Sequence, residues 1–106
     1  MRPEDVLESL VEECREDHVG LWRIVKAVRL DLGLTGPEEV RAAALGLVRT
    51  LLRERGMWAG FPAPDGRNFL PWKLPADRAL SRIEEEWLAL GRDPNIGEIA
   101  WFTSPG

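Results

Sequence analysis

The sequence has 106 residues, which is enough for one domain with a single hydrophobic core. It carries 18 acidic against 14 basic residues and one cysteine, Cys14, so an internal disulfide is excluded. The N-terminal residues lack the basic and then apolar run of a signal peptide, and no apolar run approaches the ~20 residues that span a bilayer. We therefore expect a cytoplasmic protein that has no membrane partner.

Charge is unevenly distributed along the chain. Seven acidic residues stand against two arginines up to Asp17, whereas seven basic residues stand against four acidic ones between His18 and Arg55. An acidic arm thus precedes a mildly basic middle segment. This asymmetry says more about partners than the net charge of −4 does.

The first predicted helix covers Pro3–Glu16, because apolar residues recur there at the helical spacing. They form a single stripe: Val6, Leu7, Leu10, Val11 and Cys14. The opposite face carries Glu8, Glu12, Glu13 and Glu16. Such a face is either a solvated surface or a docking surface for a basic partner, and the acidic composition alone leaves both readings open.

The second predicted helix runs from Asp17 or His18 to Leu32 and ends at Gly33. It is apolar on more than one side, which indicates a helix with two packing partners. We therefore expect it to be the central helix of the core.

The third predicted helix, Pro37–Arg55, begins at a proline followed by two glutamates and ends at Gly56. One of its sides is apolar. The other side combines small and basic residues, namely Ala42, Ala43, Gly46, Arg49, Thr50 and Arg53. Small residues let another backbone approach closely, so this side predicts either a close crossing by an earlier helix or a partner surface.

Two strands are expected next, Met57–Phe61 and Asn68–Lys73, joined by a turn with Asp65 and Arg67 at a projecting, mobile tip. A fourth helix, Ala76–Leu90, shows regular spacing of apolar residues, and an alternating strand, Glu98–Thr103, follows. The hairpin is the sheet available to that strand. We therefore predict a mostly helical α+β fold of four helices and a three-stranded antiparallel sheet. It forms one domain, 1–106, composed of a three-helix part (1–55), a hairpin (56–74) and a C-terminal helix and strand (75–106).

One buried cluster is expected to contain Leu21, Val25, Val28, Leu47, Leu51, Leu80, Ile83 and Trp87. The five tryptophans are many for this length. Trp58 and Trp72 fall on the two hairpin strands, Trp101 on the last strand and Trp87 on the facing helix. This placement favours a tryptophan-lined satellite core over a ligand pocket.

Three helices followed by a hairpin resemble the winged-helix arrangement. The segment LVRTLLRERGMWAGF (Leu47–Phe61) looks like the end of a recognition helix that passes into the wing. The resemblance extends from the first helix to Lys73. The chain departs from the pattern in its long second helix, in its tight link to the third helix and in the appended helix and strand. The resemblance implies a DNA-binding regulator.

No residue pattern in the sequence indicates a particular reaction, cofactor or metal. Cys14 and His18 are one helical turn apart, but a zinc site needs three or four ligands. We expect Cys14 to be packed and His18 to cap a helix start. Neighbouring glutamates on a helix point about 100° apart and do not converge, and no phosphate-binding glycine fingerprint is present. The sequence therefore predicts no enzyme, no cofactor and no metal site.

Two functions remain. The first is a small bacterial protein-binding module that recognises another protein, or itself, through the acidic arm or the small-residue side of the third helix. Regulating or neutralising a partner, as antitoxins and immunity proteins do, is one instance. The second, ranked lower, is the winged-helix DNA-binding regulator, which uses Arg49, Arg53 and Arg67. Glu38 and Glu39 oppose it, since recognition helices read bases with their N-terminal residues, and so does the acidic net charge.

Overall fold

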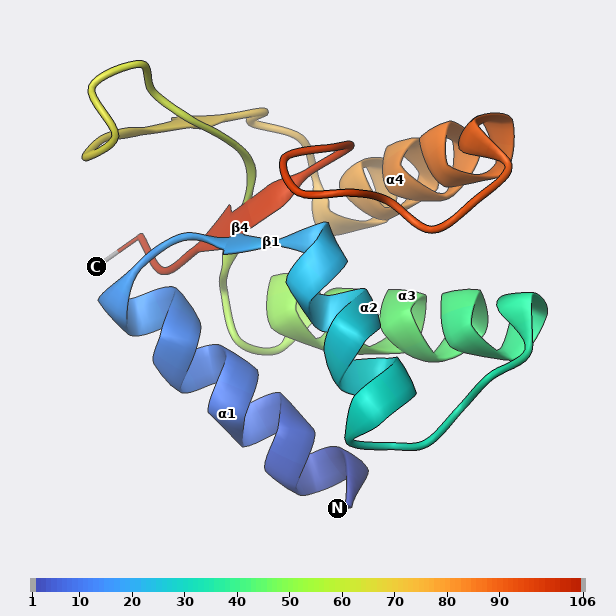
Figure 1. The fold of residues 1–106 in the computed structure, drawn as a ribbon. Helices are drawn as coiled ribbons and strands as arrows, with labels where there is room; N and C mark the ends of the chain where they lie inside the picture. The colour runs from blue at the N-terminus through green and yellow to red at the C-terminus, as the bar shows by residue number, and fades with distance from the viewer. Residues whose placement is uncertain (1, 106) are drawn as a thin grey trace.

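The computed structural model describes residues 2–105, which form an α+β fold of four helices and a four-stranded sheet (Figure 1). In chain order the elements are α1 (Pro3–Glu16), β1 (Val19–Gly20), α2 (Leu21–Leu30), α3 (Pro37–Arg53), β2 (Trp58–Pro62), β3 (Phe69–Pro71), α4 (Ala76–Leu90) and β4 (Trp101–Thr103). The predicted class and the four helices are confirmed. Both α1 and α4 keep their predicted bounds.

The sheet has the strand order β1-β4-β2-β3 and every pairing is antiparallel. The prediction of three strands was wrong by one. The additional strand is β1, where Val19 pairs with Phe102 and Gly20 with Trp101. A strand of two residues is too short to show an alternation of apolar and polar side chains. The sequence alone therefore gave no sign of β1, which is recognised by its pairing with β4. The last strand is therefore not an edge: β4 lies between β1 and β2, and Figure 1 shows it crossing the centre of the molecule.

This pairing shortens the second helix relative to its prediction. Because Val19–Gly20 is extended, α2 begins at Leu21, whose N–H donates to the carbonyl oxygen of Ala100 at 3.0 Å. The predicted strand Glu98–Thr103 is reduced to β4 because Ile99 has a φ of 70°. A left-handed β-branched residue cannot continue a regular strand.

Seven of the eight residues expected in one cluster are buried together. Leu80 is the exception, since it is half-buried at the margin of the core. The inward stripe of α4 runs through Ala79, Ile83 and Trp87, and Ala79 takes the place predicted for Leu80. At the start of α4, the apolar stripe was therefore predicted one residue too far along the chain.

The predicted tryptophan-lined satellite core is not formed. Trp87 is deeply buried, Trp22, Trp72 and Trp101 are half-buried, and Trp58 is 45% exposed. The indole N–H groups of Trp22 and Trp72 are buried without an acceptor among residues 2–105. Of the five tryptophans, Trp87 is therefore the one that lies fully inside the core.

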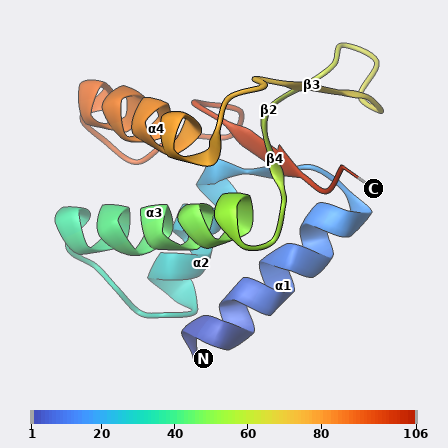
Figure 2. The ribbon, with the colours of Figure 1, turned by 180° about the vertical axis from the view of Figure 1, so that it is seen from behind.

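Helix α3 lies at the centre of the helical layer. It contacts α2 on one side and α4 on the other, and in Figure 2 α3 and α4 run side by side across the near face. Within residues 2–105, none of the helices combines the length and apolar character needed to cross a membrane.

Candidate functional site

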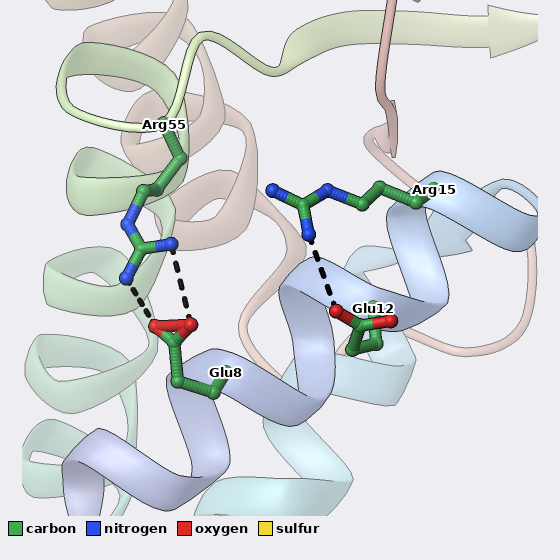
Figure 3. A network of polar contacts seen from close by, with 4 residues as sticks. All are labelled: Glu8, Glu12, Arg15 and Arg55. Atoms are coloured by element: carbon green, nitrogen blue, oxygen red, sulfur yellow. Dashed lines mark hydrogen bonds and ion pairs between the residues drawn. The ribbon is translucent and has the colours of Figure 1, made fainter.

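The acidic face of α1 is largely engaged by arginines of the same chain. Glu8 accepts two hydrogen bonds from the guanidinium of Arg55, just beyond α3, and Glu12 accepts one from Arg15 at 3.2 Å (Figure 3). Glu13 pairs with Arg23 of α2 at 3.0 Å. Glu16 is exposed and takes part in no ion pair within residues 2–105. Three of the four candidate carboxylates thus have basic partners within the chain.

The small-residue side of α3 is open to solvent. Ala42, Gly46, Arg49 and Arg53 are all exposed, and a Cβ built on Gly46 would meet no atom within 4 Å. The close crossing by an earlier helix is therefore absent. In Figure 2 no element passes in front of α3.

Of the three candidate arginines, Arg49 and Arg53 line one hollow on α3, and Arg67 does not line it. Arg53 lies 3.5 Å from Asp77 at the start of α4, whereas Arg49 has no carboxylate at ion-pair distance within residues 2–105. Arg67 belongs to the hairpin loop, which both ribbon views place across the sheet from α3 (Figures 1 and 2).

The loop that carries Arg67 has local order. The Oδ1 atom of Asp65 accepts hydrogen bonds from the backbone N–H groups of Arg67 and Asn68, each at 2.9 Å. The Asn68 bond and then the Arg67 bond lower the pKa of Asp65. The tip projects as predicted (Figure 1) and is shaped by an Asx turn.

A groove of about 440 Å³ opens between the end of α3, the hairpin strands and the start of α4. Its lining includes Leu52, Met57, Trp58, Trp72, Leu74 and Ala76. Trp58 is 45% exposed and Leu74 is 42% exposed. Single exposed apolar residues are ordinary, but here two large ones lie on the same groove, which makes it the candidate binding surface.

The groove depends on two residues with positive φ, which form the turns on either side of the hairpin. Gly56, at φ 68°, turns the chain from α3 toward β2. Lys73, at φ 57°, turns it from β3 toward α4. A non-glycine residue in this region is uncommon and is found more often at functional sites than elsewhere. Both turns contribute lining residues.

The wall formed by Trp72 is held in place. Its backbone N–H donates to the carbonyl oxygen of Ala59 at 3.0 Å, and the Arg82 guanidinium lies 3.9 Å from the centre of its ring. Arg82 in turn donates to Glu86, one helical turn further along α4, at 2.8 Å. A cation held over the ring stabilises its orientation.

Lys73 gives the groove a positive charge. It is exposed, lines the groove and forms no ion pair within residues 2–105. The residue was not singled out from the sequence. The signal that could have found it is its position between a tryptophan and a proline-led helix, where the chain has to reverse.

Cys14 and His18 have separate structural roles. Burial is the main cause that raises the pKa of the Cys14 thiol to about 12. His18 does not cap a helix as predicted: its Nδ1 lies 3.1 Å from Thr103 Oγ1, and its ring packs against Phe69. Within residues 2–105, no three potential metal ligands gather at one point.

No protein-family model matches the sequence, and no curated protein or solved structure is significantly similar to it.

Proposed function

We propose that this protein is a non-enzymatic protein-binding module whose groove takes an apolar segment of a partner protein that carries a carboxylate. The observation that carries the proposal is the exposure of Trp58 and Leu74 on an apolar groove beside Lys73. Regulation or neutralisation of that partner is the biological role that such a module would have.

Burial energetics support an apolar occupant. Removing apolar surface from water yields about 25 cal/mol per Å², and tryptophans in the centre of an interface are frequent hot spots. Because Trp72 is already fixed by Arg82 and by its backbone hydrogen bond, little ordering is required on binding.

Charge supports a carboxylate on the occupant. Lys73 is the charged residue of the groove lining, which contains no acidic residue among those described, and its ammonium has no carboxylate at ion-pair distance within residues 2–105. An opposing carboxylate on the occupant would speed association and fix its register next to the apolar groove.

The test is capture of partners from a nuclease-treated source lysate by the native chain and by matched variants. Trp58→Ala combined with Leu74→Ala should lose the partner, and Lys73→Glu should weaken its capture. Leu88→Ala is the control, since Leu88 is also an exposed leucine and lies outside this groove. Retention of the same proteins by the groove double variant, or a small molecule as the sole occupant, would refute the proposal.

DNA binding is the second candidate, supported by the order of elements. Three helices and then a hairpin follow one another from α1 to β3, which is the order of elements on which the winged-helix resemblance rests. Against it, Glu38 and Glu39 are exposed at the start of α3, and both ribbon views place the hairpin loop across the sheet from α3.

Fluorescence anisotropy with duplex DNA over a range of salt concentrations tests this candidate. We expect no tight binding at physiological salt. Binding that weakens steeply with salt and that is lost on replacing Arg49, Arg53 and Arg67 would reverse the ranking.

A further inference from the structure

The exposed face of α3 has an ordered charge pattern. Glu38 and Glu39 stand at its start, Arg49 and Arg53 stand near its end, and the small residues Ala42 and Gly46 lie between them. All six residues are exposed, and no element of the chain lies in front of α3 in Figure 2. One end of the face is therefore acidic and the other is basic. The middle carries small side chains beside a hollow that Gly46, Arg49 and Arg53 help to line.

We propose that a second copy of this chain covers this face, with the two α3 helices packed antiparallel about a two-fold axis at Gly46. This interface goes beyond the proposed function, because it lies on the exposed stripe of α3 and none of its six residues lines the Trp58 groove. A two-fold contact requires a face that is complementary to itself.

The residue spacing gives this complementarity. Glu39 precedes Gly46 by seven residues and Arg53 follows it by seven, which is close to two helical turns in each direction. In an antiparallel pair centred on Gly46, Glu39 of each copy therefore lies opposite Arg53 of the other copy. Both ends of the contact then join opposite charges.

The middle of the face fits a close helix contact. Glycine in a helix interior weakens the helix relative to alanine, and nothing within 4 Å of a Cβ at Gly46 requires it in the single chain. Its absence of a side chain lets two backbones approach closely. The helix dipole alone would favour acids at the start and bases at the end, but it gives no reason for a glycine between them.

Arg53 is available for this contact. Its pairing with Asp77 is 3.5 Å long, and the side chains are 46% and 76% exposed. Exposed pairs of this kind contribute little to stability, so giving this one up costs little.

The oligomeric state, measured by sedimentation equilibrium over a concentration series, tests the proposal. The native chain should dimerise. Gly46→Gln should be monomeric with an unchanged or raised melting temperature, because a Cβ at this position meets nothing in its own chain. Glu16→Arg on α1 is a matched charge control that should leave the dimer intact, since Glu16 is exposed and outside the contact.

Charge exchange tests the antiparallel register. Glu39→Arg and Arg53→Glu should each weaken the dimer by about tenfold or more, because each places like charges opposite one another at both ends. An equimolar mixture of the two variants should form a heterodimer. One variant then presents two arginines and the other two glutamates at these positions, so both ends of the mixed contact again join opposite charges.

Three results would overturn the proposal. They are a chain that is monomeric up to about 0.1 mM, a dimer that survives Gly46→Gln, and single-charge variants that do not pair on mixing. Loss of a different protein from the captured set on Gly46→Gln, with the native chain monomeric, would assign this face to that partner instead.

Discussion

The backbone N–H of Ser104 donates to the carbonyl oxygen of Cys14 at 3.0 Å, which ties the end of the last strand to the first helix. The preceding residues of β4 pair with β1 on one side and with β2 on the other. The C-terminal segment is therefore an internal part of the sheet.

Truncation after Pro94 should consequently unfold the domain. The deletion removes Phe102, which is fully buried, and leaves β1 and β2 without their shared partner. We expect loss of a cooperative thermal transition and a red shift in the emission of the remaining tryptophans, chiefly Trp87. Unchanged melting and emission would show that β4 contributes nothing to stability.

The sequence predicted the segments whose residues have a clear period. α1 and α4 were found with their bounds because an apolar stripe, a proline start and a following non-helical residue agree there. Also predicted was the membership of the C-terminal strand in the sheet. The spacing of apolar residues gave no signal where pairing with a strand distant in the sequence decides the backbone conformation, as at Val19–Gly20.

The candidate surfaces were predicted less completely. The exposed side of α3 follows from its helical phase, so its residues could be named from the sequence. The groove could not, because it depends on how the turns at Gly56 and Lys73 orient α3, the hairpin and α4, although these elements follow one another in the chain. Glu8 and Glu13 likewise carry no sign in the sequence that arginines from α2 and the end of α3 will meet them.

Leu51→Ala should destabilise the protein by ~2–5 kcal/mol, because a fully buried leucine leaves a cavity when truncated. Leu80→Ala is the matched variant on α4 and should cost clearly less, since Leu80 is half-buried. Urea unfolding of both variants measures the difference. Equal costs would mean that Leu80 is as deeply packed as Leu51.

Two glycine substitutions should have opposite effects on stability. A Cβ on Gly60 would clash with the carbonyl oxygen of Leu70 and would lie 2.8 Å from Pro71 Cα, so Gly60→Ala should cost ~1–3 kcal/mol or more. Gly46→Ala should instead stabilise by ~0.5–1 kcal/mol, because Gly46 is in a helix interior with open space around it. Both are measured by denaturant unfolding at low protein concentration, where self-association does not contribute. The packing of β2 against β3 would be looser than described if Gly60→Ala were neutral.

Acid should remove the contribution of Glu98. The Arg92 guanidinium, which donates two hydrogen bonds at 2.7 and 2.9 Å, and then the Asn95 N–H hold the pKa of Glu98 down at about 2. A depressed carboxyl pKa stabilises the fold above the unfolded value of 4.5, and the contribution is lost as the pH falls toward 2.

The measurement is the difference in melting temperature between the native chain and Glu98→Gln as a function of pH. The variant should melt lower at pH 7, and the two curves should converge between about pH 4.5 and 2. Glu84→Gln, at an exposed residue without an ion pair in residues 2–105, serves as the control and should show no such convergence. A constant difference across this range would mean that the Arg92 contact does not form.

The reactivity of the Cys14 thiol should report whether α1 is packed against the rest of the fold. Its side chain is buried on α1, and burial raises its pKa from 9.0 to about 12. Because the thiolate is the reactive form, the pKa alone should slow alkylation at pH 8 by a factor on the order of a thousand relative to the unfolded chain. Iodoacetamide labelling followed by mass spectrometry measures this. Rapid labelling of the native protein would contradict the burial of α1 against the sheet and helices.

In the chain truncated after Pro94, where the Ser104 contact and β4 are missing, the same residue should label at the rate seen in denaturant. Slow labelling of the truncated chain would mean that α1 remains packed without β4, and that the hydrogen bond between Ser104 and Cys14 is a consequence of the fold with no part in maintaining it.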